Sequence, residues 1–204
     1  QKDIELLPEE FNKSAWSKLL GFAERYNEPG VFSALLGFEW TSTIDGDNLH
    51  RVVVYRDGMT KAREMLPFSA LDSPDPEDLW KFMEKYEGST GGQVIAIPHN
   101  GNVSNGVMFS DKRVDGSDFD KTYTALRQRW EPLYEVTQVK GDAEAHPYLS
   151  PNDEYANFET WDQGNLRMEP KEKNMLQGEY ARSALKNGLA LSQKFGVNPF
   201  KFGL

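Results

Sequence analysis

The sequence contains no cysteine. Disulfide bonds, thiolate zinc sites and cysteine nucleophiles are therefore all excluded. Histidine is scarce as well, because only 3 occur in 204 residues, at positions 50, 99 and 146. Each of the three lies in a distinctive local context, so each is a candidate metal ligand or catalytic base.

Long apolar runs are also missing. No stretch approaches the roughly 20 consecutive apolar residues that a membrane-spanning helix needs. Basic residues are outnumbered, with 23 Lys and Arg against 32 Asp and Glu and a net charge of −9, which argues against nucleic-acid binding. The chain also opens without the basic and apolar regions of a signal peptide. A periplasmic or otherwise exported protein and a cytoplasmic one are both compatible with the sequence.

What is present suffices for a folded core, since 38% of the residues are hydrophobic and 12% are aromatic. Helical and extended patterns alternate along the chain. Helical patterns cover 9–27, 75–88, 117–130 and 178–187, with a short helix beginning at 150–153. Extended patterns cover 31–40, 50–55, 93–97 and 133–139. This alternation predicts an α/β fold with a mostly parallel sheet and outer helices, as in part of an α/β barrel.

Two candidate ligands lie at the ends of predicted strands, where α/β barrels place their chemistry. Glu39 comes near the end of an apolar strand, and a carboxylate there is costly unless it is paired, exposed or bound to a metal. A salt bridge to Lys or Arg would serve equally well. His99 follows Pro98, which favours a rigid turn and therefore the fixed position that a metal ligand needs. An incidental histidine in a strand-to-loop turn is the alternative.

The remaining candidates are weaker on position alone. His50 begins a strand, where a histidine is more often a hydrogen-bonded structural residue. Glu135 lies inside the strand predicted at 133–139. The same region also contains Glu131, Glu144, Arg129 and Lys140, which favours a salt-bridge network over a ligand role for Glu135 or His146.

Other chemistries find less support in the sequence. There is no Gly-rich phosphate loop and no Gly-x-Ser-x-Gly motif. The stretch 45–48 lacks most positions of a calcium-binding loop, so we expect a turn there. No serine has the surroundings of a nucleophile, although an esterase using serine stays an alternative. Oxygen and nitrogen ligands without thiolates suit Zn, Mn or Fe, and they do not choose among these ions.

Several motifs carry a family resemblance that extends from about residue 34 onward. They include Gly37-Phe38-Glu39-Trp40-Thr41-Ser42, Asn48-Leu49-His50-Arg51, Ile97-Pro98-His99-Asn100-Gly101-Asn102 and Gln138-Val139-Lys140-Gly141-Asp142. In this order they resemble the bacterial family of domains of unknown function numbered 3604. That family is related to the polymerase-and-histidinol-phosphatase (PHP) superfamily, which has a distorted seven-stranded α/β barrel and two or three metal ions.

The resemblance implies a fold and a set of site residues. Residues 1–204 would form a single PHP-like domain, part of a distorted (β/α)7 barrel and incomplete at both ends. The catalytic set would be Glu39, His50 and His99, with Glu39 bridging two metals and each histidine binding one. Glu135 would be a fourth metal ligand. Candidate substrate contacts are Arg51, Asn100, Asn102, Lys140 and Arg182.

The chain departs from the superfamily pattern in one respect. The superfamily also has an early His-x-His pair and a late Asp-x-His pair, whereas this chain has no histidine before His50 and none after His146. We therefore expect an internal segment of a longer protein that holds part of a metal site.

The expected function is a metal-dependent hydrolase, resembling a phosphoesterase. It would act on a small-molecule phosphate ester or related ester, using a metal-bridging hydroxide. The alternative is a non-catalytic binding or scaffold domain that retains the PHP-like fold.

Overall fold

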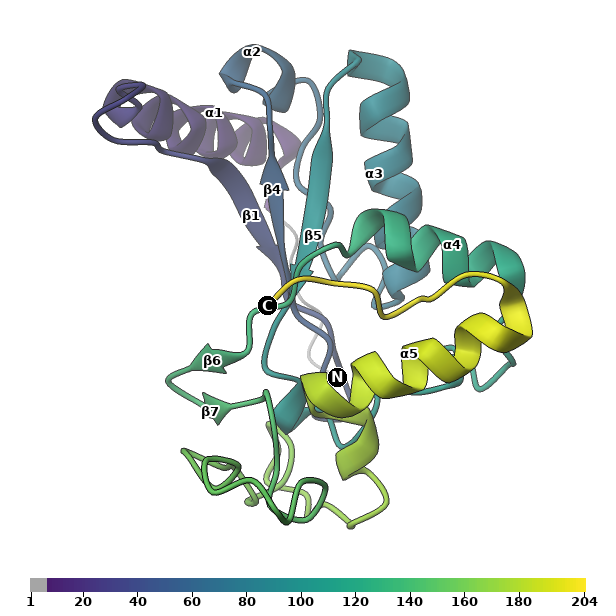
Figure 1. Ribbon diagram of the computed structural model, residues 1–204. Helices are drawn as coiled ribbons and strands as arrows, with labels where there is room; N and C mark the ends of the chain where they lie inside the picture. Colours follow the sequence, from purple (N-terminus) through teal and green to yellow (C-terminus); the bar gives the residue numbers. More distant parts are fainter. Residues whose placement is uncertain (1–6) are drawn as a thin grey trace.

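A three-stranded antiparallel sheet forms the centre of the computed structural model, which describes residues 7–204 (Figure 1). Its strands, in the order β1-β4-β5, are β1 Leu36–Trp40, β4 Arg51–Tyr55 and β5 Val94–Pro98. Two small hairpins accompany it, formed by β2 Thr43–Ile44 with β3 Asp47–Asn48 and by β6 Thr137–Gln138 with β7 Gly141–Asp142.

The α-helices are α1 Glu9–Tyr26, α2 Met59–Ala62, α3 Pro76–Thr90, α4 Lys121–Trp130 and α5 Ala181–Phe195. Two 3₁₀ turns lie at Gly101–Val103 and Leu176–Gly178. None of the helices within residues 7–204 combines the length and the apolarity needed to cross a membrane.

The predicted parallel sheet of a (β/α)7 barrel is wrong. β4 runs antiparallel to both of its neighbours, and the described sheets contain 3, 2 and 2 strands with no closed barrel. The reason lies in the connection between β1 and β4, because a parallel crossover needs a dozen or more residues and usually a helix. The segment 41–50 is shorter and holds the β2–β3 hairpin, whose turn residues Asp45 and Gly46 have φ of 52° and 98°. Positive φ at both positions is typical of a two-residue hairpin turn, so the chain reverses here.

The strand predicted at 133–139 is largely absent. Parallel pairing in the described part of the chain is limited to two single bridges, His99 with Glu135 and Leu133 with Gly203. Beyond Glu135 the chain leaves the sheet and forms the β6–β7 hairpin, whose tip carries the 94% exposed Val139. The apolar pattern predicted an extended segment, but only one short contact with β5 is formed.

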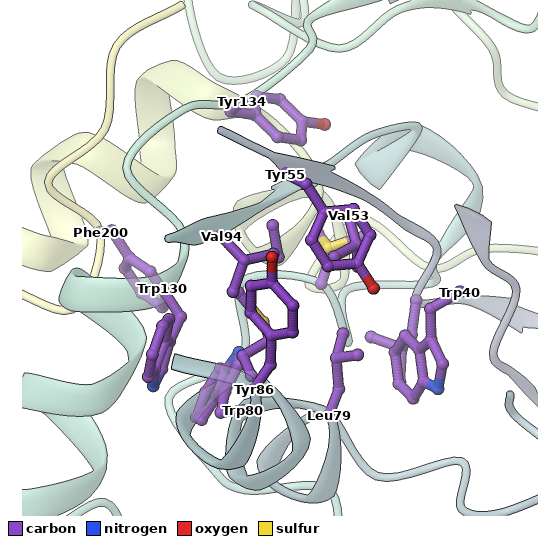
Figure 2. Close-up of a cluster of buried hydrophobic side chains, with 14 of the residues drawn as sticks. Trp40, Val53, Tyr55, Leu79, Trp80, Tyr86, Val94, Trp130, Tyr134 and Phe200 are labelled. Carbon is purple, nitrogen blue, oxygen red and sulfur yellow. The ribbon is translucent and has the colours of Figure 1, made fainter. Parts of the chain in front are cut away.

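The hydrophobic core lies on one face of the sheet (Figure 2). Burial alternates along β4 and β5, and α3 covers the buried face with Leu79, Trp80 and Tyr86. Tyr86 meets Tyr55 of β4 with ring centroids 4.8 Å apart. Burying each such side chain contributes roughly 1.5–3 kcal/mol, so this layer anchors the sheet. The opposite face is only half-buried and is free to carry polar groups.

Helix boundaries show where local signals act. α3 begins as predicted, because the Asp75 side chain accepts a hydrogen bond from the Glu77 N–H at 2.9 Å. It runs past the predicted end at residue 88 to Thr90, and Gly91 is its C-cap. The helix predicted at 178–187 instead begins at Ala181 and continues through Gly188 to Phe195. A Cβ at Gly188 would lie 2.2 Å from Asn198 Oδ1, so this glycine permits close packing and does not end the helix. The short helix predicted at 150–153 is a turn.

Candidate metal centre

Strand register places Glu39, His50 and His99 on the same face of the sheet. Glu39 pairs with Val52 across β1 and β4. One step beyond the last β4–β5 pair, the His99 N–H donates to the His50 carbonyl at 3.4 Å. Because side chains alternate along a strand and directly paired residues share a face, all three side chains point away from the α3 layer.

The three side chains converge on one point. Glu39 Oε1 lies 3.0 Å from His50 Nδ1 and 3.2 Å from His99 Nε2. One ligand atom from each residue lies within 4.8 Å of the others. Two atoms that each lie about 2.1 Å from one ion are about 3.0 Å apart at a right angle and about 3.4 Å apart at the tetrahedral angle, so the two distances to Glu39 Oε1 are close to those of a shared ion. Within residues 7–204 no other group of His, Asp and Glu converges in this way.

The surroundings of this Glu39–His50–His99 cluster favour neutral imidazoles. The side chains of His50 and His99 are only 12% and 4% exposed, whereas Glu39 is 47% exposed. Burial lowers the pKa of both histidines; the charge of Glu39 opposes this and that of Lys140 reinforces it. Neutral imidazole is the form that binds a metal, so the cluster needs little deprotonation before an ion enters.

Neighbouring polar groups hold both histidines in place. Thr43 Oγ1 lies 3.0 Å from His50 Nε2, the ring nitrogen that faces away from Glu39. The buried Asn48 side chain donates to the carbonyls of His99 at 2.8 Å and Asn100 at 3.1 Å. Such outer contacts orient metal-binding histidines in many sites. Sequence reasoning missed both Thr43 and Asn48, although Asn48 lies within one of the quoted motifs.

The turn after β5 is built to present His99. Asn100 has a left-handed φ of 53°, and the Gly101 N–H donates to the Tyr134 hydroxyl at 2.9 Å. A Cβ at Gly101 would lie 2.4 Å from the Glu179 carbonyl oxygen, so only glycine fits there. His99 Nδ1 and Asn100 Oδ1 are buried and have no hydrogen-bond partner among the described residues. Unsatisfied buried polar atoms of this kind are uncommon. His99 Nδ1 is the ring nitrogen that does not contact Glu39, so it is not one of the converging ligand atoms.

Three further residues predicted for the site lie around the cluster, namely Glu135, Lys140 and Asn102. Glu135 donates its N–H to the Pro98 carbonyl at 3.1 Å, and its charge raises the pKa of His99. Its carboxylate is not one of the three converging groups. Lys140 acts on the pKa of both histidines, and its carbonyl accepts a hydrogen bond from the Asn102 side chain at 2.9 Å.

Two predicted substrate contacts are engaged elsewhere. Arg51 follows His50 and so points to the opposite face, where it is 1% exposed and its Nε lies 3.0 Å from Glu131 Oε1. Arg182 on α5 pairs with Glu144 at 2.8 Å and also with Asp153. The structure brings neither guanidinium into the cluster.

The residues expected to form one salt-bridge network form separate ion pairs. Glu131 pairs with Arg51 and Arg127, whereas Arg129 pairs with Glu87. The third histidine, His146, lies 3.0 Å from Asp162 and takes no part in the cluster.

Comparison with known proteins yields one match, to a protein family. No curated protein and no solved structure matches the chain. The family match covers residues 2–204 and so includes every member of the cluster. The chain belongs to the family described as Protein of unknown function (DUF3604).

Proposed function

We propose that the protein is a metal-dependent hydrolase of phosphate esters or related esters. The observation that carries this proposal is the convergence of one carboxylate oxygen and two imidazole nitrogens within 4.8 Å of one another. A donor set of this kind, without thiolates, suits Zn, Mn or Fe. The resemblance of the surrounding motifs to the PHP superfamily supports the reaction class.

Different residues of the chain have different roles in such a site. A divalent ion, when bound, supplies polarisation of an ester oxygen and lowers the pKa of water toward neutrality. His50 and His99 are the nitrogen ligands, and Glu39 is the oxygen ligand that contacts both of them. Lys140 adds a positive charge beside the two imidazoles, which favours an anionic ester oxygen. Glu39 is half-exposed, so a substrate can approach from its side.

The decisive test compares two histidine variants. His99→Ala should lose bound metal, measured by elemental analysis, and the chelator-sensitive hydrolysis of aryl phosphate esters. His146→Ala is the matched control, because His146 pairs with Asp162 outside the cluster. It should keep both the metal and the activity. Unchanged metal content in His99→Ala would contradict the proposal.

A non-catalytic binding domain is the second candidate. It is favoured by the contacts of Glu39 Oε1, which lies within hydrogen-bond distance of both imidazoles, because these contacts can by themselves hold the three side chains together. A metal-free protein without esterase activity would support this candidate. Hydrolysis that survives strong chelators would instead favour a serine esterase.

A further inference from the structure

Residues 161–171 form an irregular segment that contacts both parts of the chain that carry the histidines of the cluster. The pairing of β4 with β5 ends at Arg51 and Pro98, so His50 and His99 lie one residue beyond the last pair. Their positions therefore depend on the β2–β3 hairpin, which leads into His50, and on the turn after β5, which begins with His99. This bridging segment contacts the hairpin and the turn.

Asn165 joins the bridging segment to the hairpin. Its side chain is buried, and its amide nitrogen donates to Asp47 Oδ1 at 2.8 Å. Its amide oxygen accepts hydrogen bonds from two backbone N–H groups of the segment itself. The Leu166 N–H adds a second contact, to the Gly46 carbonyl at 2.9 Å. Asp47 is the neighbour of Asn48, so these contacts hold the part of the hairpin that supports both histidines.

Lys171 joins the bridging segment to the turn after β5. Its ammonium group donates to the carbonyls of Asn102 at 2.6 Å and Trp161 at 2.8 Å, and to Glu179 Oε2 at 2.9 Å. These acceptors engage all three N–H groups of the lysine. The side chains of Lys171 and Glu179 are 6% and 0% exposed. Asn102 follows His99 by three residues, so the ammonium group holds the far end of the turn.

The buried Lys171–Glu179 pair contributes little to stability. Burial raises the pKa of Glu179 to about 7, although Lys171 opposes this shift. The carboxylate therefore loses more on burial than the ammonium group returns, and replacing such a pair by uncharged groups is often neutral or stabilising. What the pair supplies is geometry, because Lys171 Nζ connects three separate points of the chain.

We propose that Asn165 and Lys171 are positioning residues of the candidate metal centre, which hold the β2–β3 hairpin and the turn after β5 where His50 and His99 can share one ion. This inference rests on the proposed function. Neither residue is a ligand, and each acts through the backbone of a segment that carries a histidine.

Metal titration of two variants tests the proposal. Lys171→Met combined with Glu179→Gln removes the three N–H donors without leaving an unpaired buried charge, and Asn165→Ala removes the contact with the hairpin. Affinity for Mn²⁺ should fall about tenfold in each, the lower end of the effect of contacts outside the ligands. The visible absorption of bound Co²⁺ should also change, because it depends on ligand geometry. Wild-type affinity and spectra in both variants would overturn the proposal.

Leu20→Ala is the matched control for a general loss of stability. Leu20 is fully buried on α1, a helix that carries no ligand of the cluster. The substitution should lower stability by leaving a cavity, while the Mn²⁺ affinity and the Co²⁺ spectrum stay unchanged. An equal loss of affinity in Leu20→Ala would overturn the proposal, because affinity would then follow stability.

Amide hydrogen exchange in the metal-free protein separates this inference from the proposed function. In both positioning variants, exchange at residues 43–50 and 99–105 should become faster relative to exchange in β4, since these segments lose a local contact. Faster exchange there, with no metal bound even by the wild-type protein, would overturn the proposed function alone. Unchanged exchange together with wild-type metal affinity would overturn only the positioning roles.

Discussion

His50 and Arg51 are adjacent in the sequence, yet they belong to two charged clusters on opposite faces of β4. Arg51 pairs with Glu131, which also pairs with Arg127 at 3.3 Å and accepts a hydrogen bond from Trp80 at 3.1 Å. The side chains of this Arg51–Glu131–Arg127 cluster are at most 5% exposed. In the Glu39–His50–His99 cluster the carboxylate is 47% exposed.

The difference separates a structural cluster from a candidate binding site. In the Arg51–Glu131–Arg127 cluster both carboxylate oxygens have buried partners, so no group is left to take a ligand. In the Glu39–His50–His99 cluster the three groups converge beside solvent, because the Glu39 side chain is half-exposed. Charge alone therefore says little about function, whereas the accessibility of the charged groups is informative.

Removing the charge of each glutamate should give the largest difference in stability between the two clusters. Glu131→Gln would leave two buried guanidinium groups without a counterion and should cost about 3–5 kcal/mol of unfolding free energy. Glu39→Gln should cost less than about 1 kcal/mol, because its side chain is half-exposed, but it should weaken metal binding. Urea denaturation measures the first effect and metal titration the second. Equal losses of stability would show that both clusters are structural.

A smaller effect is expected at Asn48, which holds the backbone of the His99 turn. Asn48→Ala would leave the carbonyls of His99 and Asn100 without their buried donor, at a cost of about 1–3 kcal/mol. Because the turn positions a ligand, metal affinity should also fall by about 10–100-fold. Asn12→Ala, at an exposed position on α1, should change neither quantity. Normal metal affinity in Asn48→Ala would mean that the turn holds its shape without this contact.

The smallest expected effect is the acid dependence of stability. Burial opposes ionisation of Glu131, but Arg51 and Arg127 outweigh it and hold its pKa below the usual value of 4.5. The unfolded chain therefore binds more protons than the folded one as the pH falls below about 4.5, and stability is lost there. Glu131 should change the unfolding free energy by no more than about 1.4 kcal/mol per pH unit. This contribution should be absent in Glu131→Gln. Unfolding curves between pH 3 and 7 would show whether the two proteins differ.

Local signals in the sequence explain the elements that were predicted well. The helix at 75–88 was predicted from an Asp-Pro start, and the structure shows the Asp75 capping contact directly. The strands predicted at 50–55 and 93–97 correspond to β4 and β5, since their β-branched and apolar residues are suited to a buried sheet. The segment 133–139 has a similar composition, but it lacks a partner strand along its full length. No local pattern reveals that lack.

The candidate site was predicted in part. The structure brings Glu39, His50 and His99 together, as the motifs indicated, while Arg51 and Arg182 are held by other carboxylates. Alternation along a strand indicates that His50 and Arg51 point in opposite directions. It does not indicate which direction is covered, because that depends on where α3 packs.

The sequence by itself determined the chemistry that is available: imidazole and carboxylate donors without thiolates, placed at the ends of apolar strands. It also determined the main helices through caps and apolar periodicity, which act over a few residues. Only the tertiary structure decided that the strands are antiparallel and that Glu39 reaches both histidines. Strand direction and convergence depend on contacts between segments far apart in the chain, from β1 through the turn after β5, and no local pattern encodes such contacts.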